Sequence, residues 1–294
     1  MILVGIAETK DEQDIIEPWV RHNMVLLDKL TIVDDSQDKT YAILQSLATE
    51  FQGRIGLERQ VEFGDFQARR TTELFHKSRE ADFVFPLDAD EFLGVTTRVE
   101  LEQQLQKIPL GGVGNMPWCT FVVTPDTIEA CAQDPPKGFQ YRRYAELPLH
   151  WKVVVRMEGL DWASHWIGVG NHDCRSPKGT APGVELSELP LLHFPLRNRE
   201  QMVAKTILRW ISASAANPTM RINGGAWHIR RNFDSLVTGQ ELDLCELSWM
   251  YAQDDKPGLV REDPKIDYKR VYSSGQSMNA LALIAKTWEN SLTK

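Results

Sequence analysis

The chain has 294 residues, which is enough for one large α/β domain or two smaller ones. With 42% hydrophobic and 25% charged residues the composition is that of a globular protein, and 33 basic against 41 acidic side chains give a formal charge of −8. A net acidic chain argues against a general nucleic-acid binder, so we expect no nucleic-acid partner.

The cysteines and the apolar segments argue against further kinds of protein. The four cysteines lie far apart and form no CxxC pair, which argues against a structural zinc site and favours reduced thiols. The N-terminal stretch MILVGIAETKDE lacks the basic region of a signal peptide. No stretch reaches the roughly 18 apolar residues of a membrane-spanning helix. We therefore expect a cytoplasmic protein without a transmembrane segment; the sequence leaves peripheral contact with a membrane open.

The first hundred residues alternate between predicted strands and helices. Apolar runs predict strands at 2–7, 30–35, 54–61 and 81–88, and apolar residues at helical spacing predict helices at 12–29, 41–51 and 66–80. Strands separated by helices of this length form right-handed βαβ units. This part of the chain is therefore predicted to form a mainly parallel, Rossmann-like sheet flanked by helices.

The pattern changes after residue 94. We expect a helix at 97–107, antiparallel strand-like stretches at 111–123, 139–147 and 152–157, loops at 124–138 and 159–195, and helices at 198–215, 240–252 and 276–291. The long loop at 159–195 is rich in Gly, His, Trp and Pro, a composition that favours a site-building role.

Acidic side chains follow several of the predicted strands. The first strand ends at Glu8, the second at Asp35, and the apolar run FVFPL ends in Asp88 and Asp90. Ligands of parallel α/β sheets bind outside the carboxyl ends of the strands. These carboxylates are therefore expected to line one edge of the sheet.

Two carboxylates separated by one residue, as in DAD at 88–90, can reach one hard cation directly or through water. A divalent ion held in this way neutralises phosphate oxygens. The alternative is a helix N-terminus, in which Asp88 is the cap while Asp90 and Glu91 stabilise the first turn. Because other acidic strand ends are predicted nearby, we favour the metal.

Three segments together resemble the nucleotide-sugar domain of family 2-like glycosyltransferases of the GT-A fold. They read VGIAETKDEQDIIEPWVRHN (4–23), LTIVDDSQDKT (30–40) and FPLDADEFL (85–93). A fourth, LLHFPLRNREQMVAKTI (191–207), resembles the H-[FY]-P-x-R-[SN]-x-[EQ]-Q-x-x-x-K segment of the same subgroup. The resemblance covers residues 1–95 well and 150–210 more loosely.

The resemblance implies a fold, an organisation and an activity. It implies a GT-A fold with a nucleotide-sugar-binding half at 1–95, a smaller antiparallel acceptor-side half of the same domain at 96–220, and a C-terminal helical extension at 221–294. The implied enzyme moves a sugar from a nucleotide-diphosphate donor, by default a UDP-sugar, to a glycan, lipid-linked or small-molecule acceptor, with inversion, as in polysaccharide biosynthesis. The implied cofactor is Mn²⁺ or Mg²⁺.

Carried onto this sequence, the resemblance also implies donor-binding residues. Ala7 and Glu8 fall at the nucleoside-contacting end of the first strand, although many relatives have a small or hydroxyl residue in place of Glu8. Asp35 matches the residue that contacts the base or ribose. Arg69 and Arg70 fall where relatives place a basic residue facing the base or phosphates, with a solvated helical face as the alternative.

The metal and phosphate residues are implied in the same way. Asp90 would bind the metal directly, and Asp88 would contact the ribose or reach the metal through water. His193 would complete the metal shell or touch the diphosphate, unless it is a core histidine. Arg197 and Lys205 are candidate phosphate partners, because guanidinium and ammonium groups pair with phosphate. For Lys205 the alternative is plain helix surface.

An inverting transferase needs a base near the acceptor hydroxyl to take its proton. The segment WASHWIGVGNHD (162–173) is predicted to wall the acceptor site. Its candidate bases are Asp173, His172 and His165, and Glu91 of the acidic motif is a further candidate.

Two other enzyme classes use similar features. A haloacid-dehalogenase-type phosphatase carries DxD with Thr or Val next, where this chain has Glu91, and its motif usually opens the domain. A nucleotidyltransferase making a nucleotide sugar usually has a Gly-rich basic loop after the first strand, where AETKDEQD has no glycine. A non-catalytic glycan-binding protein is a further alternative, against which the intact DADE argues.

Overall fold

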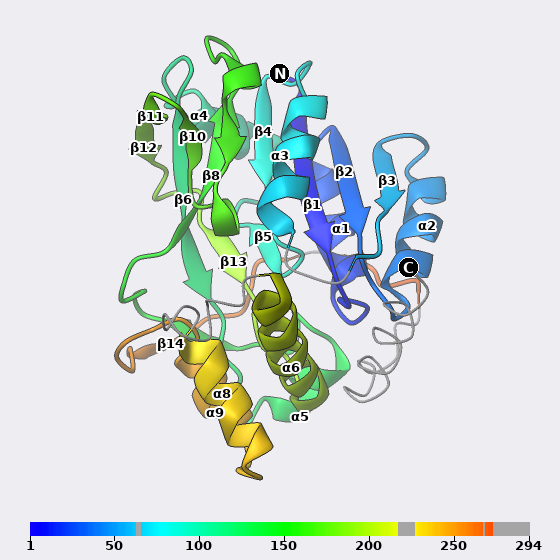
Figure 1. Cartoon of the computed structure of the whole chain (residues 1–294), viewed down its shortest axis with the longest axis vertical. Helices are drawn as coiled ribbons and strands as arrows, with labels where there is room; N and C mark the ends of the chain where they lie inside the picture. The colour runs from blue at the N-terminus through cyan, green and yellow to red at the C-terminus, as the bar shows by residue number, and fades with distance from the viewer. Residues whose placement is uncertain (63–65, 217–226, 267, 273–294) are drawn as a thin grey trace.

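The computed structural model describes residues 1–62, 66–216, 227–266 and 268–272. Its N-terminal part alternates strand and helix in the predicted order (Figure 1): β1 (Leu3–Thr9), α1 (Ile16–Leu26), β2 (Lys29–Asp34), α2 (Thr40–Glu50), β3 (Ile55–Arg59), α3 (Gln67–Lys77) and β4 (Phe83–Pro86). The seven elements predicted in this region are confirmed, with bounds that differ by a few residues.

One sheet runs through both halves of the chain, in the order β3-β2-β1-β4-β8-β6-β13-β5, with β12 (Gly183–Glu185) beside β6. The first four strands are parallel. β8 (Trp151–Arg156) runs antiparallel between β4 and β6 (Val113–Thr120), and β13 (Leu191–His193) runs parallel to β6 with β5 (Glu91–Leu93) antiparallel beside it. The predicted mainly parallel α/β sheet with an antiparallel portion is therefore confirmed.

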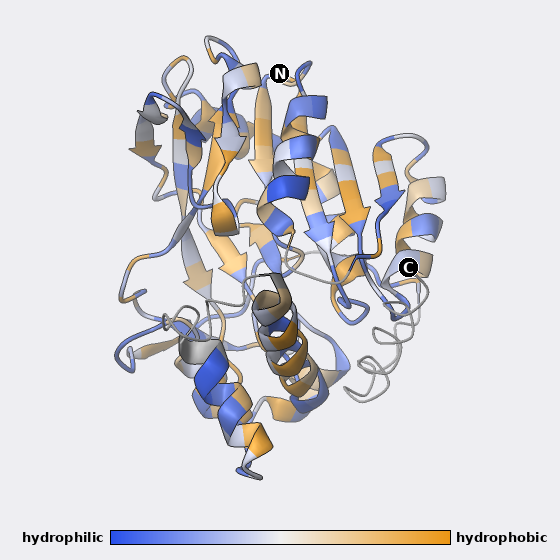
Figure 2. Ribbon diagram, in the orientation of Figure 1, coloured by the Kyte–Doolittle hydropathy of each residue, from blue (hydrophilic) through white to orange (hydrophobic). Residues whose placement is uncertain are grey.

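The apolar run of β1 is explained by burial on both faces of the sheet. Leu3 and Ala7 belong to the core shared with α1 and α2, whereas Val4 and Ile6 belong to the core shared with α3. Alternate side chains of a strand point to opposite faces, so each face receives its own apolar set. The orange strands in Figure 2 show this apolar interior.

The remaining helices and short strands are not part of this large sheet. They are α4 (Arg98–Leu105), α5 (Ile128–Gln133), β7 (Tyr141–Arg143) paired with β14 (Leu259–Arg261), β9 (Trp166–Ile167), β10 (Cys174–Ser176), β11 (Gly179–Thr180), α6 (Arg199–Ala216), α8 (Trp227–Val237) and α9 (Leu244–Trp249). The prediction of a loop throughout 124–138 is wrong, because α5 forms in the space between Pro125 and Pro135. The helix predicted at 276–291 lies outside the described residues.

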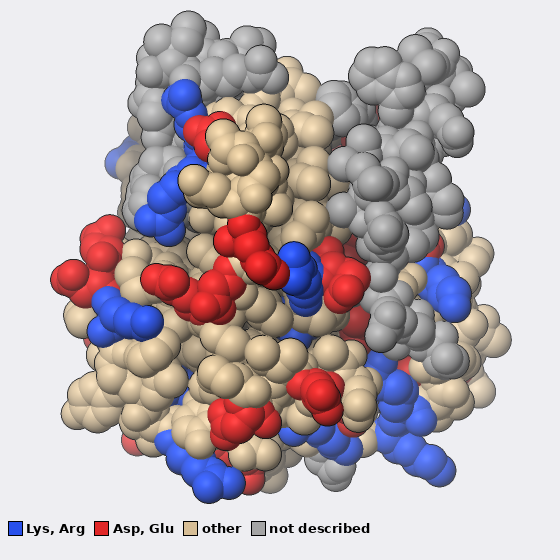
Figure 3. Space-filling model, turned by 90° about the horizontal axis from the view of Figure 1, so that it is seen from below, with Lys and Arg blue, Asp and Glu red and all other residues tan. Residues whose placement is uncertain are grey.

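Within the described ranges, no helix combines the length and apolar character needed to cross a bilayer. On the face seen from below, where α5, α6, α8 and α9 lie nearest, acidic and basic side chains are interspersed (Figure 3). Where the described residues are visible in this view, they form no large patch of a single charge.

Candidate functional site

The acidic motif forms a turn between two strands. β4 ends at Pro86, the backbone turns at 89–90, and β5 begins at Glu91, whose N–H donates to the carbonyl oxygen of Asp88 (3.1 Å). The next helix, α4, begins only at Arg98 and has its own cap, Thr97. The helix-cap alternative for the acidic motif is therefore wrong, and the carboxylates must find their partners in the tertiary structure.

Asp88 is held by three side chains from other elements. Lys152 of β8 donates from Nζ to Asp88 Oδ2 (2.6 Å), and Gln67 and Asn171 donate to Asp88 Oδ1 at 2.7 and 3.1 Å. The Lys152 ammonium also donates to the carbonyl oxygen of Gly170 (2.7 Å). Burial disfavours a charged lysine, but the neighbouring carboxylates outweigh it and raise the pKa of Lys152. Sequence reasoning missed Lys152, whose only signal is a lone lysine within an apolar strand.

Glu91 lies wholly beneath the turn. Its Oε1 accepts from Trp118 Nε1 (2.7 Å), and its Oε2 accepts from the N–H of Asp88 (3.1 Å). Burial raises the pKa of Glu91 to about 8, although Lys152 opposes the shift. A carboxyl group with no exposed surface and both oxygens engaged is suited to bracing the turn.

Asp90 meets a lysine and a histidine that come from much later in the sequence. Lys205 of α6 donates from Nζ to Asp90 Oδ2 (2.7 Å) and to the carbonyl oxygen of Pro195 (3.0 Å). The N–H of Phe194 donates to the carbonyl oxygen of Asp90 (2.9 Å), which places His193 beside the motif. Burial alone would raise the pKa of Asp90, but the ammonium group of Lys205 above all holds it well below its usual value. Asp90 is therefore ionised at neutral pH.

His193 is neutral and firmly oriented. Burial holds the pKa of His193 well below its usual value. Its Nδ1 lies 3.2 Å from the hydroxyl of Thr120, and its ring stacks on Trp118 with 4.1 Å between centroids. A second hydrogen bond of this kind fixes the ring of a metal-binding histidine. Sequence reasoning also missed Trp118, which is one tryptophan in a predicted strand and gives no periodic signal.

Beside the acidic motif, two side-chain atoms that could bind a metal ion have no protein partner within the described ranges. Among the described residues, Asp90 Oδ1 and His193 Nε2 have no hydrogen-bond partner, whereas Oδ2 and Nδ1 of the same side chains are engaged. No three His, Cys, Asp or Glu side chains in the described part of the chain converge on one point. A carboxylate and an imidazole nevertheless suit Mn²⁺ or Mg²⁺ when substrate phosphates and water supply the other ligands. The residues present therefore fit such an ion.

Arg197 is wholly buried and is paired with carboxylates of the loop after β1. Its Nε and Nη2 donate to both carboxylate oxygens of Asp14 (2.8 and 2.9 Å), and Nη2 also pairs with Glu12. Burial raises the pKa of Glu12 to about 7 despite the nearby guanidinium. Arg197 thus ties the segment after β13 to the loop after β1.

At the other end of the edge, Arg70 of α3 forms a buried network. Its Nη1 donates to Asp35 Oδ2 (3.2 Å) and pairs with Glu8, and its Nη2 donates to the carbonyl oxygen of Gln60 (3.0 Å). Glu8, the departure from the family pattern, is therefore the counter-ion of Arg70. Arg69 points elsewhere, is half exposed and pairs with Glu62.

Ala7 does not extend this network toward a ligand. Its side chain is 1% exposed and belongs to the core cluster shared with α1 and α2. Only its backbone lies near the edge of the sheet.

The predicted bases of the 162–173 segment have different surroundings. His172 Nδ1 donates to the carbonyl oxygen of Trp151 (2.5 Å), which leaves Nε2 as an acceptor. Burial, with Lys152 nearby, lowers the pKa of His172, so the ring is neutral at pH 7. Asp173 Oδ2 accepts two hydrogen bonds from Arg175 (2.8 and 2.6 Å). His165 turns back to the carbonyl oxygen of Asp161. Of these three, His172 is the one suited to accept a proton beside the motif, with its ring 6.0 Å from that of Trp118.

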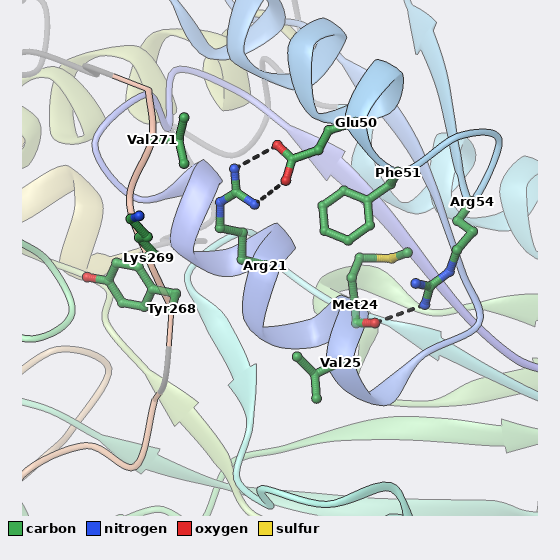
Figure 4. A pocket seen from close by; sticks show the side chains of 9 residues that line it. All are labelled: Arg21, Met24, Val25, Glu50, Phe51, Arg54, Tyr268, Lys269 and Val271. Carbon is green, nitrogen blue, oxygen red and sulfur yellow. Dashed lines mark hydrogen bonds and ion pairs between the residues drawn. The ribbon is translucent and has the colours of Figure 1, made fainter.

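A further depression on the described surface lies away from the acidic motif. It measures about 660 Å³ and lies between α1, the end of α2 and residues 268–271 (Figure 4). Arg21 points at Glu50 with hydrogen bonds of 2.7 and 2.8 Å, and Arg54 donates to the carbonyl oxygen of Met24 (2.9 Å). Its lining includes none of the motif residues, and its two arginines already donate to protein oxygens.

No protein-family model matches the chain, and no curated protein matches it. Among solved structures, the chain is similar to S. aureus TarS residues 1–349 in complex with UDP, with TM-score 0.44, 12% identity, and 74% of this chain and 67% of that one covered. It is similar to the mannosyltransferase PcManGT from Pyrobaculum calidifontis in complex with GDP-Man and Mn²⁺, with TM-score 0.34, 16% identity and coverages of 52% and 44%. It is also similar to a putative glucose-1-phosphate thymidylyltransferase from Bacillus anthracis, with TM-score 0.30, 10% identity and coverages of 42% and 61%. The chain thus spans less than two thirds of the second and third of these proteins.

Proposed function

We propose that the protein is a metal-dependent glycosyltransferase that moves a sugar from a nucleotide-diphosphate donor to a carbohydrate, lipid-linked or small-molecule acceptor. The observation that carries the proposal is the pair formed by ionised Asp90 and neutral His193 at the carboxyl edge of the sheet, each with one ligand atom left. The sequence resemblance supports the same activity. Location in the cytoplasm and a part in polysaccharide biosynthesis stay predictions.

The diphosphate of the donor would lie against Asp90 and His193. Asp90 and His193 would hold Mn²⁺ or Mg²⁺, and such an ion supplies charge stabilisation for the departing nucleoside diphosphate. Lys205, which reaches Asp90 from α6, would add an ammonium partner for a phosphate oxygen. Asp88, clamped by Lys152, would contact the ribose or a metal-bound water.

The nucleoside would bind at the ends of β1 and β2. Asp35 lies there with Lys10 and Arg70 on the same carboxylate oxygen, each at 3.2 Å. The Glu8–Arg70 pair holds Asp35 in place for a ribose or base. UDP is the first nucleotide to test, because the family resemblance implies it.

His172 is the base that we propose for the acceptor hydroxyl. Its Nε2 lone pair would take the acceptor proton as the bond to the sugar C1 breaks, which is the role required for inversion. Asp173 is neutralised by Arg175 and Glu91 is enclosed under the turn, so both are better suited to positioning.

The proposal is tested by thermal unfolding with nucleotide sugars, with and without Mn²⁺ or Mg²⁺. A donor at 100 times its Kd should stabilise the protein by about 2.7 kcal/mol. Asp90→Asn should abolish the metal-dependent part of this shift and lower kcat/KM by roughly 10²–10³-fold, as expected for lost charge stabilisation. Glu80→Gln is the matched control, because Glu80 is 89% exposed and far from the edge.

The same assays separate the rival activities. Release of a nucleoside diphosphate supports sugar transfer, whereas release of pyrophosphate would identify a nucleotidyltransferase. A phosphatase of the haloacid-dehalogenase type would need Asp88 as a free nucleophile, but both of its oxygens accept hydrogen bonds. Absence of any metal-dependent nucleotide-sugar shift in the wild-type protein would overturn the proposal.

A further inference from the structure

Helices α6, α8 and α9, which lie together below the sheet in Figure 1, enclose a small cavity. It measures about 40 Å³, and its walls include Lys205 and Arg209 of α6, Arg231 of α8 and Tyr251, which follows α9. A water molecule needs roughly 10–15 Å³ of such a cavity, so about three water-sized groups fit, whereas sites for whole small molecules start at about 300 Å³. The cavity therefore suits one phosphoryl group and is too small for a sugar ring.

Two residues in the walls of this cavity also contact the proposed metal pair. Lys205 donates from Nζ to Asp90 Oδ2 (2.7 Å). The ring of Tyr251 meets the ring of His193 edge-on, with 5.6 Å between their centroids. The Lys205 ammonium lies 5.9 Å from the centre of the Tyr251 ring. Lys205 and Tyr251 are therefore shared between the cavity and the Asp90–His193 pair.

Arg209 belongs to the same face of α6 as Lys205, because residues four apart are neighbours on a helix surface. Its side chain is exposed, and its Nη1 donates to the hydroxyl oxygen of Tyr251 (2.9 Å). Tyr251 is the main cause of a raised pKa for this guanidinium, and the carboxylates of Asp88 and Asp90 add to it. Arg209 therefore lies within the electrostatic reach of the acidic motif.

The charges in the cavity favour an anion. The described residues that line it include three cationic side chains and no carboxylate. The charge of Lys205 is compensated by Asp90, but among the described residues Arg209 has only a hydroxyl oxygen as its partner. A guanidinium without a carboxylate partner keeps its charge and most of its five N–H donors for a phosphate, which it can bind through two parallel hydrogen bonds.

We propose that Arg209 binds a phosphate oxygen in this cavity, and that this oxygen belongs to the diphosphate of the sugar donor. The word donor rests on the proposed function, whereas the binding of a phosphate by Arg209 can be tested without it. A diphosphate has two phosphoryl groups, so one can lie at Asp90 and His193 while the other meets Arg209. The guanidinium would stabilise the negative charge on the diphosphate as the bond from the sugar C1 breaks and leaves its electron pair on the phosphate oxygen.

The test is calorimetric titration of the full chain with inorganic pyrophosphate, UDP and uridine, each with and without Mg²⁺. Pyrophosphate and UDP should bind the wild type, and Arg209→Gln should weaken both by at least about tenfold, as expected for a hydrogen bond between charged groups. Uridine has no phosphate, so its affinity should be equal in both proteins. Arg209→Lys keeps the charge and should lose less affinity. Both variants should keep the melting temperature of the wild type, because Arg209 is exposed.

Arg199→Gln is the matched control, because Arg199 lies on the same helix, is 62% exposed and pairs with Glu241 away from the cavity lining. Binding of pyrophosphate and UDP by Arg209→Gln as tightly as by the wild type would overturn the assignment. An equal loss of affinity in Arg199→Gln would overturn it as well.

A titration with D-glucose 6-phosphate distinguishes the donor from a phosphorylated acceptor. If Arg209→Gln weakens binding of this sugar phosphate but not of UDP, the assignment to the donor is wrong. Steady-state kinetics with nucleotide sugars separates the two proposals. Pyrophosphate binding that depends on Arg209, without any transfer or hydrolysis of a nucleotide sugar, refutes only the transferase. Sugar transfer with an unchanged kcat/KM in Arg209→Gln refutes only the role of Arg209.

Discussion

The two ends of the carboxyl edge use charge in different ways. At the β1–β2 end, both terminal nitrogens of Arg70 have oxygen partners from Glu8, Asp35 and Gln60, and the guanidinium is wholly buried. At the β4–β13 end, Asp90 and His193 each use one side-chain atom for a protein contact, and each has a second atom without a partner among the described residues. In the first arrangement only the buried Nε of Arg70 has no hydrogen-bond partner among the described residues, and both terminal nitrogens are satisfied by protein oxygens, so we call it closed. In the second, a carboxylate oxygen and an imidazole nitrogen that could bind a metal ion are left open.

This difference indicates which charges stabilise the fold and which serve chemistry. A buried ion pair is costly to break, because one partner is left charged without compensation. A side chain with a spare donor or acceptor atom contributes less to the fold and more to binding a ligand. The variants below test this division, because removal of a closed group should cost stability and removal of an open group should cost activity.

His172→Gln should give the largest effect on activity. His172 belongs with the open side chains, because Nδ1 donates to the protein while the Nε2 atom is available as an acceptor. Loss of a general base typically costs about 10²–10⁴-fold in kcat. Donor binding and the melting temperature should stay close to the wild type, which steady-state kinetics and thermal unfolding check.

The pH profile gives a second readout for the same residue. A general base works only when it is unprotonated, and the pKa of His172 is lowered. The apparent pKa of the acidic limb in the pH profile of kcat should therefore lie below the ordinary histidine value of about 6.5. The limb should disappear in His172→Gln. A variant with wild-type kcat, or an unchanged acidic limb, would move the base to another residue.

Arg70→Met should mainly cost stability. Removing the cation leaves Glu8 and Asp35 buried together, and breaking such a pair costs about 3–5 kcal/mol. Chemical denaturation measures this loss, and Arg69→Met serves as the control because Arg69 is half exposed and should change stability by less than about 1 kcal/mol. If Arg70→Met unfolds like the wild type but binds nucleotide sugars poorly, the guanidinium serves ligand binding and not the stability of the fold, and the division fails.

Glu91→Gln should give the smallest effect, which is a change in how the melting temperature depends on pH. The pKa of Glu91 is raised to about 8 from 4.5, so its contribution to stability is complete below pH 4.5 and is lost as pH rises through about 8. The melting temperature of the wild type should therefore fall more between pH 5.5 and 8 than that of Glu91→Gln. A variant with the same pH dependence as the wild type would show that Glu91 is ionised at neutral pH. Glu80→Gln is again the control.

The parts of the fold that could be predicted are those set by local pattern. The run LVGIA in β1 is apolar at every position because both faces of that strand are covered, and this is visible in the sequence. The acidic ends of β1, β2 and β4 were placed on one edge because parallel strands must point the same way.

The parts that could not be predicted depend on contacts between distant segments. Lys152 looks like an ordinary polar residue in a strand until β8 is placed beside β4, where its ammonium meets Asp88. The neighbours of Arg197 in sequence predict a phosphate partner, but they do not indicate its pairing with Asp14 from the loop after β1, which the structure shows. No periodicity carries such information, since each pair is created by the packing of whole elements.

The hydrogen bond from Phe194 to Asp90, and the reach of Lys205 to the same residue, also set an order of events during synthesis. The chain must grow by 114 residues beyond Glu91 (205 − 91) before Lys205 exists, which takes roughly 6 to 23 s at ribosomal speeds of about 5–20 residues per second. Throughout that interval the acidic turn lacks Lys205, and it lacks Lys152 and His193 until the chain has grown past each of them. An N-terminal fragment that folds its βαβ units would therefore carry the acidic turn without its contact to Lys205, which forms only once α6 has been synthesised.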